Sequence, residues 1–166
     1  MFKAAALLSA ALPCAALLCT GLAQAGTVDV QFEQPDRYTD IGPQREAALV
    51  QARLRDILQT LGAARLPANQ VLRLAITDVD LAGEIPPSTR LMHDVRVMGQ
   101  HPDWPRISLR YTLREGDRVL AEGTEVVADM AYLMRISRHG ARSSLPYEQR
   151  MLGAWFDSRF GQPAGR

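Results

Sequence analysis

The sequence predicts an α+β fold, a single two-layer sandwich in which a mainly antiparallel sheet of about four strands packs against two helices. Several segments alternate apolar and polar residues, which is the period of a half-buried strand. Two other segments carry apolar residues at helical spacing. The strands also place arginines on one face, so one side of the sheet meets solvent, as antiparallel sheets allow. The predicted order is strand, helix, strand, an optional edge strand, hairpin and helix.

The first strand is predicted at Thr27–Phe32, where apolar and polar residues alternate. Gly42 and Pro43 then suit an N-cap and a first helical position, where the missing N–H of proline costs nothing. A helix follows, and Gly62 is predicted to lie just past its end. The apolar stripe of this helix comprises Ala47, Val50, Leu54, Ile57, Leu58 and Leu61.

In the second strand, Val71–Leu81, the apolar residues switch from one face of the strand to the other near Thr77. Up to that point alternate residues are apolar, but Asp78 and Asp80 would continue the same face. Two unpaired buried carboxylates are prohibitively costly. We therefore expect either a bulge that turns the strand over, or carboxylates that emerge beyond the cover of the packed helix.

Residues 83–105 are rich in proline and glycine and are predicted as a surface loop, although the alternation in 94–98 allows a short edge strand. A hairpin follows, with apolar residues alternating from Ile107 to Leu113 and a turn at Glu115-Gly116-Asp117. The last helix is predicted to open at Pro146 and to end at Gly161, with Trp155 in its apolar, core-facing stripe.

Length and composition predict one domain with one core. The chain has 166 residues, of which 47% are hydrophobic and 22% charged, which excludes a disordered or fibrous protein. A chain of this size buries roughly two-thirds of its unfolded surface, so packing alone can stabilise it.

Residues 1–25 have the features of a secretory signal peptide. Lys3 precedes an apolar stretch from Ala4 to about Leu22, and Ala23-Gln24-Ala25 forms a small-x-small cleavage motif. We predict cleavage after Ala25, a single domain over 26–166, and a periplasmic location without a membrane anchor after cleavage.

Both cysteines, Cys14 and Cys19, lie inside the signal segment, so the exported protein would have none. The residues before them are Pro13 and Leu18, not the small residue that lipidation of a cysteine requires. Lys3 is the only lysine, so its removal leaves 18 arginines against 18 acidic residues. This balance argues against a general nucleic-acid or membrane-surface binder.

The chain shows no recognised catalytic motif. The exported part lacks cysteine and a G-x-S-x-G elbow, and its three histidines, His93, His101 and His139, have no zinc-ligand spacing. We therefore predict no catalytic residue, no metal and no cofactor. An oxygen-ligand site from Asp78, Asp80 and Asp94 is an alternative; aspartates that accept hydrogen bonds from loop backbone are the simpler interpretation.

The stretch 135–144 concentrates cations, hydroxyls and glycine before a helix start. Arg135, Arg138 and Arg142 suit an anion or an acidic partner. The simpler interpretation is a solvated basic loop.

Six segments, read in order, resemble an exported proteobacterial family known as domain of unknown function 3016. They are VDVQFEQPDRYTDIG, ITDVDLAGE, DVRVM, PRISLRYTL, ADMAYLMR and LPYEQRMLGAWFDSRF. The resemblance covers nearly the whole chain after the signal segment and implies a compartment, but no activity, ligand or catalytic residue. The positions it associates with the family pattern are Tyr38, Asp40, Asp78, Asp80, Asp94, Arg96, Arg110, Asp129, Tyr132 and Trp155.

These observations predict an exported, non-catalytic binding or envelope-assembly module. A carboxylate-based hydrolase and a small-molecule or ion-binding protein are the alternatives. The expected partner is an envelope protein or an anionic ligand, and the oligomeric state is left open. The candidate binding residues are Asp78, Asp80, Asp94, Arg96, Asp129, Tyr132, Arg135, Arg138 and Arg142.

Overall fold

The computed structural model describes residues 25–85, 96–98, 103–134 and 144–161. Their elements form four strands, two helices and one short 3-10 helix, which confirms the predicted α+β class. In chain order these are β1 (Thr27–Phe32), η1 (Pro35–Arg37), α1 (Gln44–Arg65), β2 (Gln70–Asp80), β3 (Arg106–Glu115), β4 (Arg118–Ala128) and α2 (Pro146–Phe160).

The four strands make one sheet in the order β1-β2-β3-β4. β1 pairs parallel to β2, and α1 supplies the connection that a parallel pair requires. The other two pairs are antiparallel, and a turn at Gly116 joins β3 to β4. Gly116 has a φ of +56°, which suits a glycine in a tight hairpin turn. β1 and β4 are therefore the two edges of the sheet.

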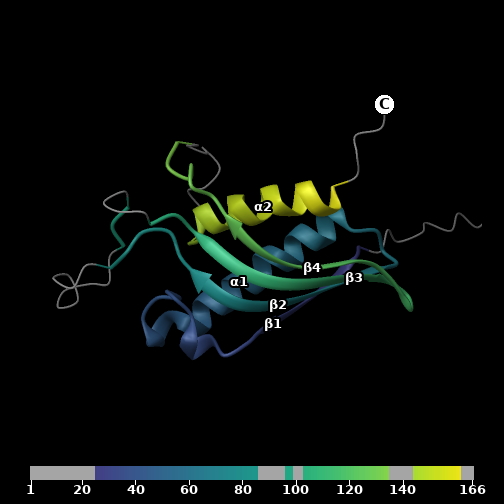
Figure 1. Ribbon diagram of the computed structural model, residues 1–166, viewed down its shortest axis with the longest axis horizontal. Coiled ribbons are helices and arrows are strands. Elements are labelled where there is room, and N and C mark those ends of the chain that lie inside the picture. The colour runs from purple at the N-terminus through teal and green to yellow at the C-terminus, as the bar shows by residue number, and fades with distance from the viewer. Residues whose placement is uncertain (1–24, 86–95, 99–102, 135–143, 162–166) are drawn as a thin grey trace, which may run out of the picture.

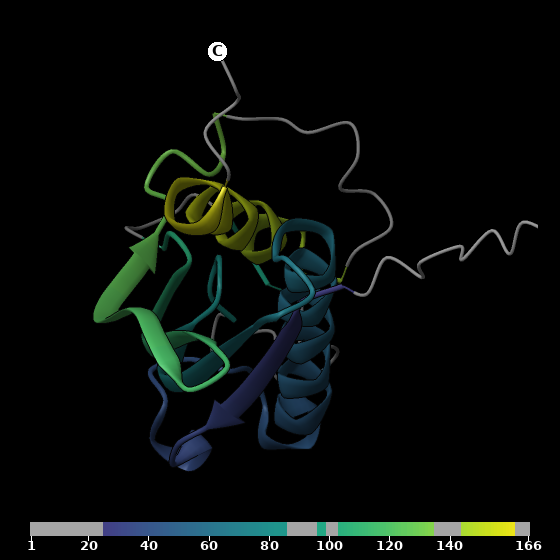
Figure 2. The same ribbon diagram turned by 90° about the vertical axis from the view of Figure 1, so that its right-hand side faces the viewer.

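Both helices cover the same face of the sheet (Figure 1), so the opposite face meets solvent. α1 packs mainly against β1, and α2 lies toward β4 (Figure 2). The core between the two layers is apolar, and its largest fully buried side chains come from all the main elements except the edges of the sheet. They include Leu54, Leu58, Leu72, Leu74, Ile76, Ile107, Leu109, Leu152 and Phe156.

The switch of the apolar residues from one face of β2 to the other is caused by a register shift. β2 and β3 pair regularly up to Ile76 opposite Leu109, and pairing resumes at Asp78 opposite Ser108. Thr77 is the extra residue, so the strand turns over at that point. Val79 consequently faces the core with no exposed surface, and Asp78 and Asp80 lie on the open face. The first of the two expected explanations is thus confirmed.

The prediction that Gly62 ends the first helix is wrong, because α1 continues to Arg65. Gly62 is buried where the helix crosses β1, and a Cβ atom added to it would overlap Cγ2 of Val28. The glycine permits a close approach of helix and strand. Pro43 was expected at the first helical position, but it is the N-cap. Its carbonyl oxygen accepts hydrogen bonds from the N–H groups of Glu46 and Ala47.

The edge strand allowed at 94–98 is not formed by the described residues. Only an isolated antiparallel bridge joins Val97 to Glu84. The remaining elements follow expectation, with β1, the hairpin and α2 where the sequence places them. Within the described residues, neither helix has the length and apolarity needed to cross a membrane.

We expect Gly62→Ala to lower the free energy of unfolding by about 1–3 kcal/mol, because the new methyl group overlaps Val28. The matched control is Gly153→Ala in α2, where the nearest atom, Cδ2 of Leu61, lies 3.9 Å from the added Cβ. That change should stabilise by about 0.5–1 kcal/mol through helix propensity. Urea unfolding measures both. Equal effects of the two substitutions would contradict the close approach.

Candidate functional site

Polar side chains gather at the end of the sandwich where β2 and β4 finish and β3 and α2 begin. The antiparallel order of β2, β3 and β4 brings these ends together, and the N-terminal turn of α2 joins them. We call this region the polar end. Its members are Asp40, Asp78, Asp80, Arg96, Asp103, Arg106, Asp129, Tyr132, Glu148 and Arg150.

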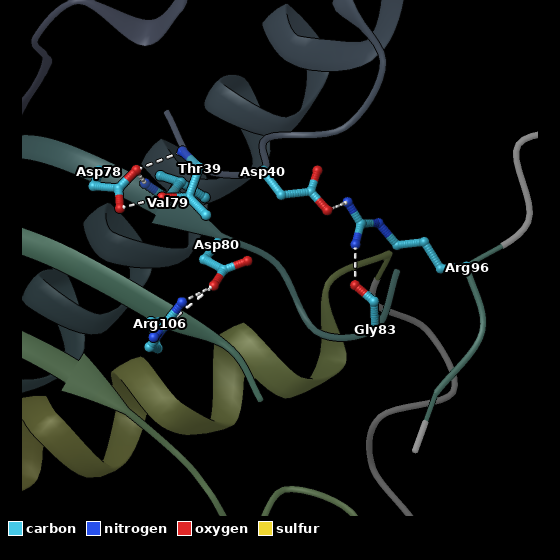
Figure 3. Close-up of polar contacts among 8 residues, drawn as sticks. All are labelled: Thr39, Asp40, Asp78, Val79, Asp80, Gly83, Arg96 and Arg106. Carbon is cyan, nitrogen blue, oxygen red and sulfur yellow. Dashed lines mark hydrogen bonds and ion pairs between the residues drawn. The ribbon is translucent and has the colours of Figure 1, made fainter. Parts of the chain in front are cut away.

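Asp78 holds the segment that follows η1 against β2. Its Oδ1 accepts hydrogen bonds from the backbone N–H groups of Thr39 at 2.7 Å and of Val79 at 2.9 Å. Its Oδ2 accepts from the Thr39 hydroxyl at 2.8 Å. Figure 3 shows these contacts. Three donors thus hydrogen-bond to this carboxylate, which joins β2 to the segment after η1. We call these three contacts the clasp.

Tyr38 makes a second contact beside this clasp. Its hydroxyl donates to the carbonyl oxygen of Ile76 at 2.8 Å, next to the register shift. Burial raises the pKa of Tyr38 to about 12, and the nearby Glu33 and Asp78 charges add to the shift. The hydroxyl therefore stays protonated and keeps donating at physiological pH.

Asp80 and Asp40 each pair with a different arginine (Figure 3). Asp80 accepts from Arg106, its cross-strand neighbour, with Oδ2 at 2.5 Å from Nη2. Asp40 accepts from Arg96 at 2.7 Å. Arg96 also donates to the carbonyl oxygen of Gly83 at 2.6 Å, so one guanidinium connects two loops. These pairs use the carboxylates for structure.

Glu148, in the first turn of α2, is the one buried charged residue of the described chain, with 2% of its surface exposed. Its Oε1 accepts from the Ala82 N–H at 2.8 Å and so joins the helix to the segment after β2. Burial raises the pKa of Glu148 above its ordinary value, while the hydrogen bond from Ala82 and the charge of Arg96 oppose this shift.

A turn at residues 129–134 follows β4, and the polar end fixes it. The N–H of Asp129 donates to the carbonyl oxygen of Pro105 at 3.3 Å, and its Oδ1 accepts from the Ala131 N–H at 3.1 Å. Arg150 of α2 donates to the Tyr132 carbonyl oxygen at 2.5 Å and to Oδ2 of Asp129 at 3.2 Å. The turn is therefore anchored to α2 and to the start of β3.

Tyr132 adds a side-chain anchor to the same turn. Its hydroxyl donates to Oδ1 of Asp103 at 2.6 Å, and its ring, which is buried, meets Tyr147 edge to face at 5.0 Å between centroids. Asp129 and Tyr132, two of the predicted site residues, thus hold a loop in one conformation.

The fixed turn presents apolar side chains to solvent. Met130 is 75% exposed and Met134 is 86% exposed, and Leu133 is also exposed. Val126, near the end of β4, is 66% exposed. We call these four residues the apolar patch. Exposed large apolar side chains are typical of interaction surfaces.

A groove of about 360 Å³ lies beside the apolar patch, between the end of β4 and α2. Its apolar lining includes Val127, Met151 and Trp155, which are otherwise buried. A second hollow, of about 530 Å³, lies on the open face of the sheet. There, arginines and carboxylates alternate, as with Arg73 beside Asp29 on the neighbouring strand, and the hollow favours neither sign of charge.

The structure brings five of the nine predicted residues to the polar end: Asp78, Asp80, Arg96, Asp129 and Tyr132. Asp94, Arg135, Arg138 and Arg142 lie outside the described residues. Within the described ranges, no three His, Cys, Asp or Glu side chains are grouped so as to hold a metal ion. Sequence reasoning missed Asp103, Glu148 and Arg150, whose partners are far away in the chain and which have no local signal.

We predict that Asp78→Asn lowers the free energy of unfolding by about 1–3 kcal/mol, because an amide cannot accept from all three donors. Asp29→Asn, an exposed change on β1, should stay within about 0.5 kcal/mol of the parent. Chemical denaturation of both variants tests this. If Asp78→Asn were as stable as the parent, the clasp would not be structural.

Glu148→Gln should change the pH dependence of stability. Because the folded-state pKa of Glu148 is raised, its favourable contribution exists below the unfolded-state pKa of about 4.5 and is lost as pH rises through the folded-state pKa. The glutamine variant cannot ionise, so its stability relative to the parent should increase as pH rises above about 4.5. Glu46→Gln, at the same third position of α1 but exposed, is the control. Parallel pH profiles for Glu148→Gln and the parent would contradict the expectation.

Comparisons with known proteins identify a family but indicate no activity for it. None of the curated proteins compared with this chain matches it. A matching solved structure is that of a protein described as a "putative lipoprotein" from Caulobacter crescentus CB15, with 16% sequence identity, a TM-score of 0.28, and coverage of 82% of this chain and 93% of that chain. The family model described as protein of unknown function (DUF3016) matches residues 26–158. Because this match spans most of the sequence, the chain belongs to the DUF3016 family.

Proposed function

We propose that the chain is exported to the periplasm, cleaved after Ala25, and acts there as a non-catalytic module that binds another protein of the cell envelope. The observation that carries this proposal is the apolar patch, three of whose four residues lie on a turn that four polar side chains hold in place. Rigid apolar side chains cost little conformational entropy on binding, and desolvation of their surface favours association.

The proposed export rests on the signal-like segment, and the fold is compatible with its removal. β1 begins at Thr27, two residues after the proposed cleavage point, so cleavage leaves every described element intact. The N–H of Gly26 donates to the carbonyl oxygen of Leu66 at 3.1 Å, a contact that the cleaved chain retains.

The arrangement of the carboxylates supports binding over hydrolysis. A carboxylate-based hydrolase needs acidic groups that reach a shared substrate. Here Asp78 is occupied by Thr39, Asp80 by Arg106 and Asp129 by Arg150. Each carboxylate therefore serves its own structural contact.

Site-specific photo-crosslinking in intact cells tests the proposed partner contact. A photoreactive residue at position 130 or 134 should give one discrete crosslinked product with an envelope protein, because both side chains project from the patch. The same residue at position 53, exposed on α1, is the matched control. Fractionation of the same cells, with mass spectrometry of the N-terminus, tests cleavage before Gly26.

The paired change Met130→Ser and Met134→Ser should abolish the crosslink from a probe at position 133. Its stability should stay within about 0.5 kcal/mol of the parent, since both methionines are largely exposed. Identical products from position 53 and the patch would count against the proposal, as would a crosslink that survives the double substitution.

A further inference from the structure

We propose that the outer edge of β4, among the described residues, takes up an extended segment of the partner protein as a fifth strand, with apolar side chains in the groove beside α2 and a carboxylate near Arg159. This inference rests on the proposed function, because the same partner would cover the apolar patch. It adds a recognition mode and a partner chemistry to that function.

The first argument is the backbone of β4. β4 is an edge strand of 11 residues, and in its antiparallel pairing with β3 alternate residues direct their N–H and C=O groups away from the sheet. The register shift that disturbs it lies at the hairpin end, near Leu113 and Arg114. From Ala121 to Ala128 the pairing is regular and contains no proline, whose missing N–H would interrupt pairing with a further strand.

The second argument is the groove of about 360 Å³ along the same strand. Val127 points to the helix side of the sheet, opposite Ile107, and Met151 and Trp155 supply the facing wall from α2. A strand added beside β4 would direct every second side chain toward this groove. Ala154, a small residue, also lines the groove, so apolar side chains of the added strand have room to enter.

The third argument is charge. One arginine–carboxylate pair, Arg150 with Asp129, lines the groove, and a second, Arg159 with Glu125, adjoins it at Trp155. In each pair the arginine is the more exposed member. For Arg159 and Glu125 the exposed fractions of the side chains are 50% and 20%. Trp155 also donates to Glu125 at 2.9 Å, which further occupies that carboxylate. An incoming segment therefore meets the exposed guanidinium of Arg159, a group that binds carboxylates.

These three features favour one occupant, an extended peptide segment with alternating apolar residues and an acidic residue near one end. Backbone pairing would supply affinity, and the groove and the adjoining Arg159 would supply specificity. A second copy of this chain and a lipid surface are the competing occupants, and the experiment separates them.

The experiment selects binders from a display library of random linear peptides against residues 26–166 and maps them by amide hydrogen exchange. We expect enriched peptides to alternate apolar residues and to carry a terminal acidic residue. On binding, alternate amides of β4 between 121 and 128 should exchange more slowly, which contact through side chains alone would not produce. Arg159→Gln should weaken binding about tenfold, and Arg53→Gln should leave it unchanged.

Three results would overturn the inference. Selected peptides that leave β4 exchange unaltered, or a selection that yields no binder, would exclude strand addition by such segments. Protection of β4 that rises with protein concentration, without peptide, would assign the edge to self-association. Protection produced by anionic lipid vesicles, and not by peptide, would assign the surface to lipid.

The two proposals fail separately. A cellular crosslink from position 133 that depends on Met130 and Met134, combined with unprotected β4 amides, would keep the binding module and reject strand addition. Absence of any crosslink from the patch of the otherwise unsubstituted protein, together with unprotected amides, would reject both.

Discussion

The polar end of this protein depends on the register shift at Thr77 in β2. Without the shift, Asp78 and Asp80 would continue the buried face that Leu74 and Ile76 occupy. With it, Val79 completes the core and Asp80 lies opposite Arg106 at the start of β3. The adjacent Pro105 carbonyl then accepts from Asp129, which begins the turn after β4. One extra residue in a strand next to the edge strand thus positions a loop two strands away.

The carboxylates of the polar end connect segments that the chain brings together from far apart. Asp78 joins β2 to the segment after η1, Glu148 joins α2 to Ala82, and Asp129 joins the end of β4 to Arg150. Each contact costs desolvation of a charge and is balanced by directed hydrogen bonds. The contacts of Asp129 and Tyr132 join the turn at 129–134, which carries exposed methionines, to α2 and to the segment before β3.

Much of the fold could be predicted from local patterns, because the spacing of apolar residues that marks a strand or a helix is visible within a few neighbouring residues. Thr27–Phe32 and the hairpin follow from alternation alone, and the register shift in β2 is one of the two explanations that the alternation leaves open. The role of Gly62 could not be predicted, because the sequence does not distinguish a glycine that ends a helix from one that makes room for a neighbouring side chain such as Val28. The site was only partly predictable. Asp129 and Tyr132 were identified, but their contacts with Arg150 and Asp103 span long stretches of chain and depend on the tertiary fold.

The central claim is that the polar end holds the turn at 129–134 rigid while its apolar side chains face solvent. Amide hydrogen exchange of the free protein tests it directly. The N–H groups of Ala131, Tyr132 and Met134 donate to Oδ1 of Asp129, the Asp129 carbonyl and the Ala131 carbonyl. Slow exchange at these three amides, beside exposed methionine side chains, is the predicted result. Exchange at the rate of an unstructured peptide would contradict the account.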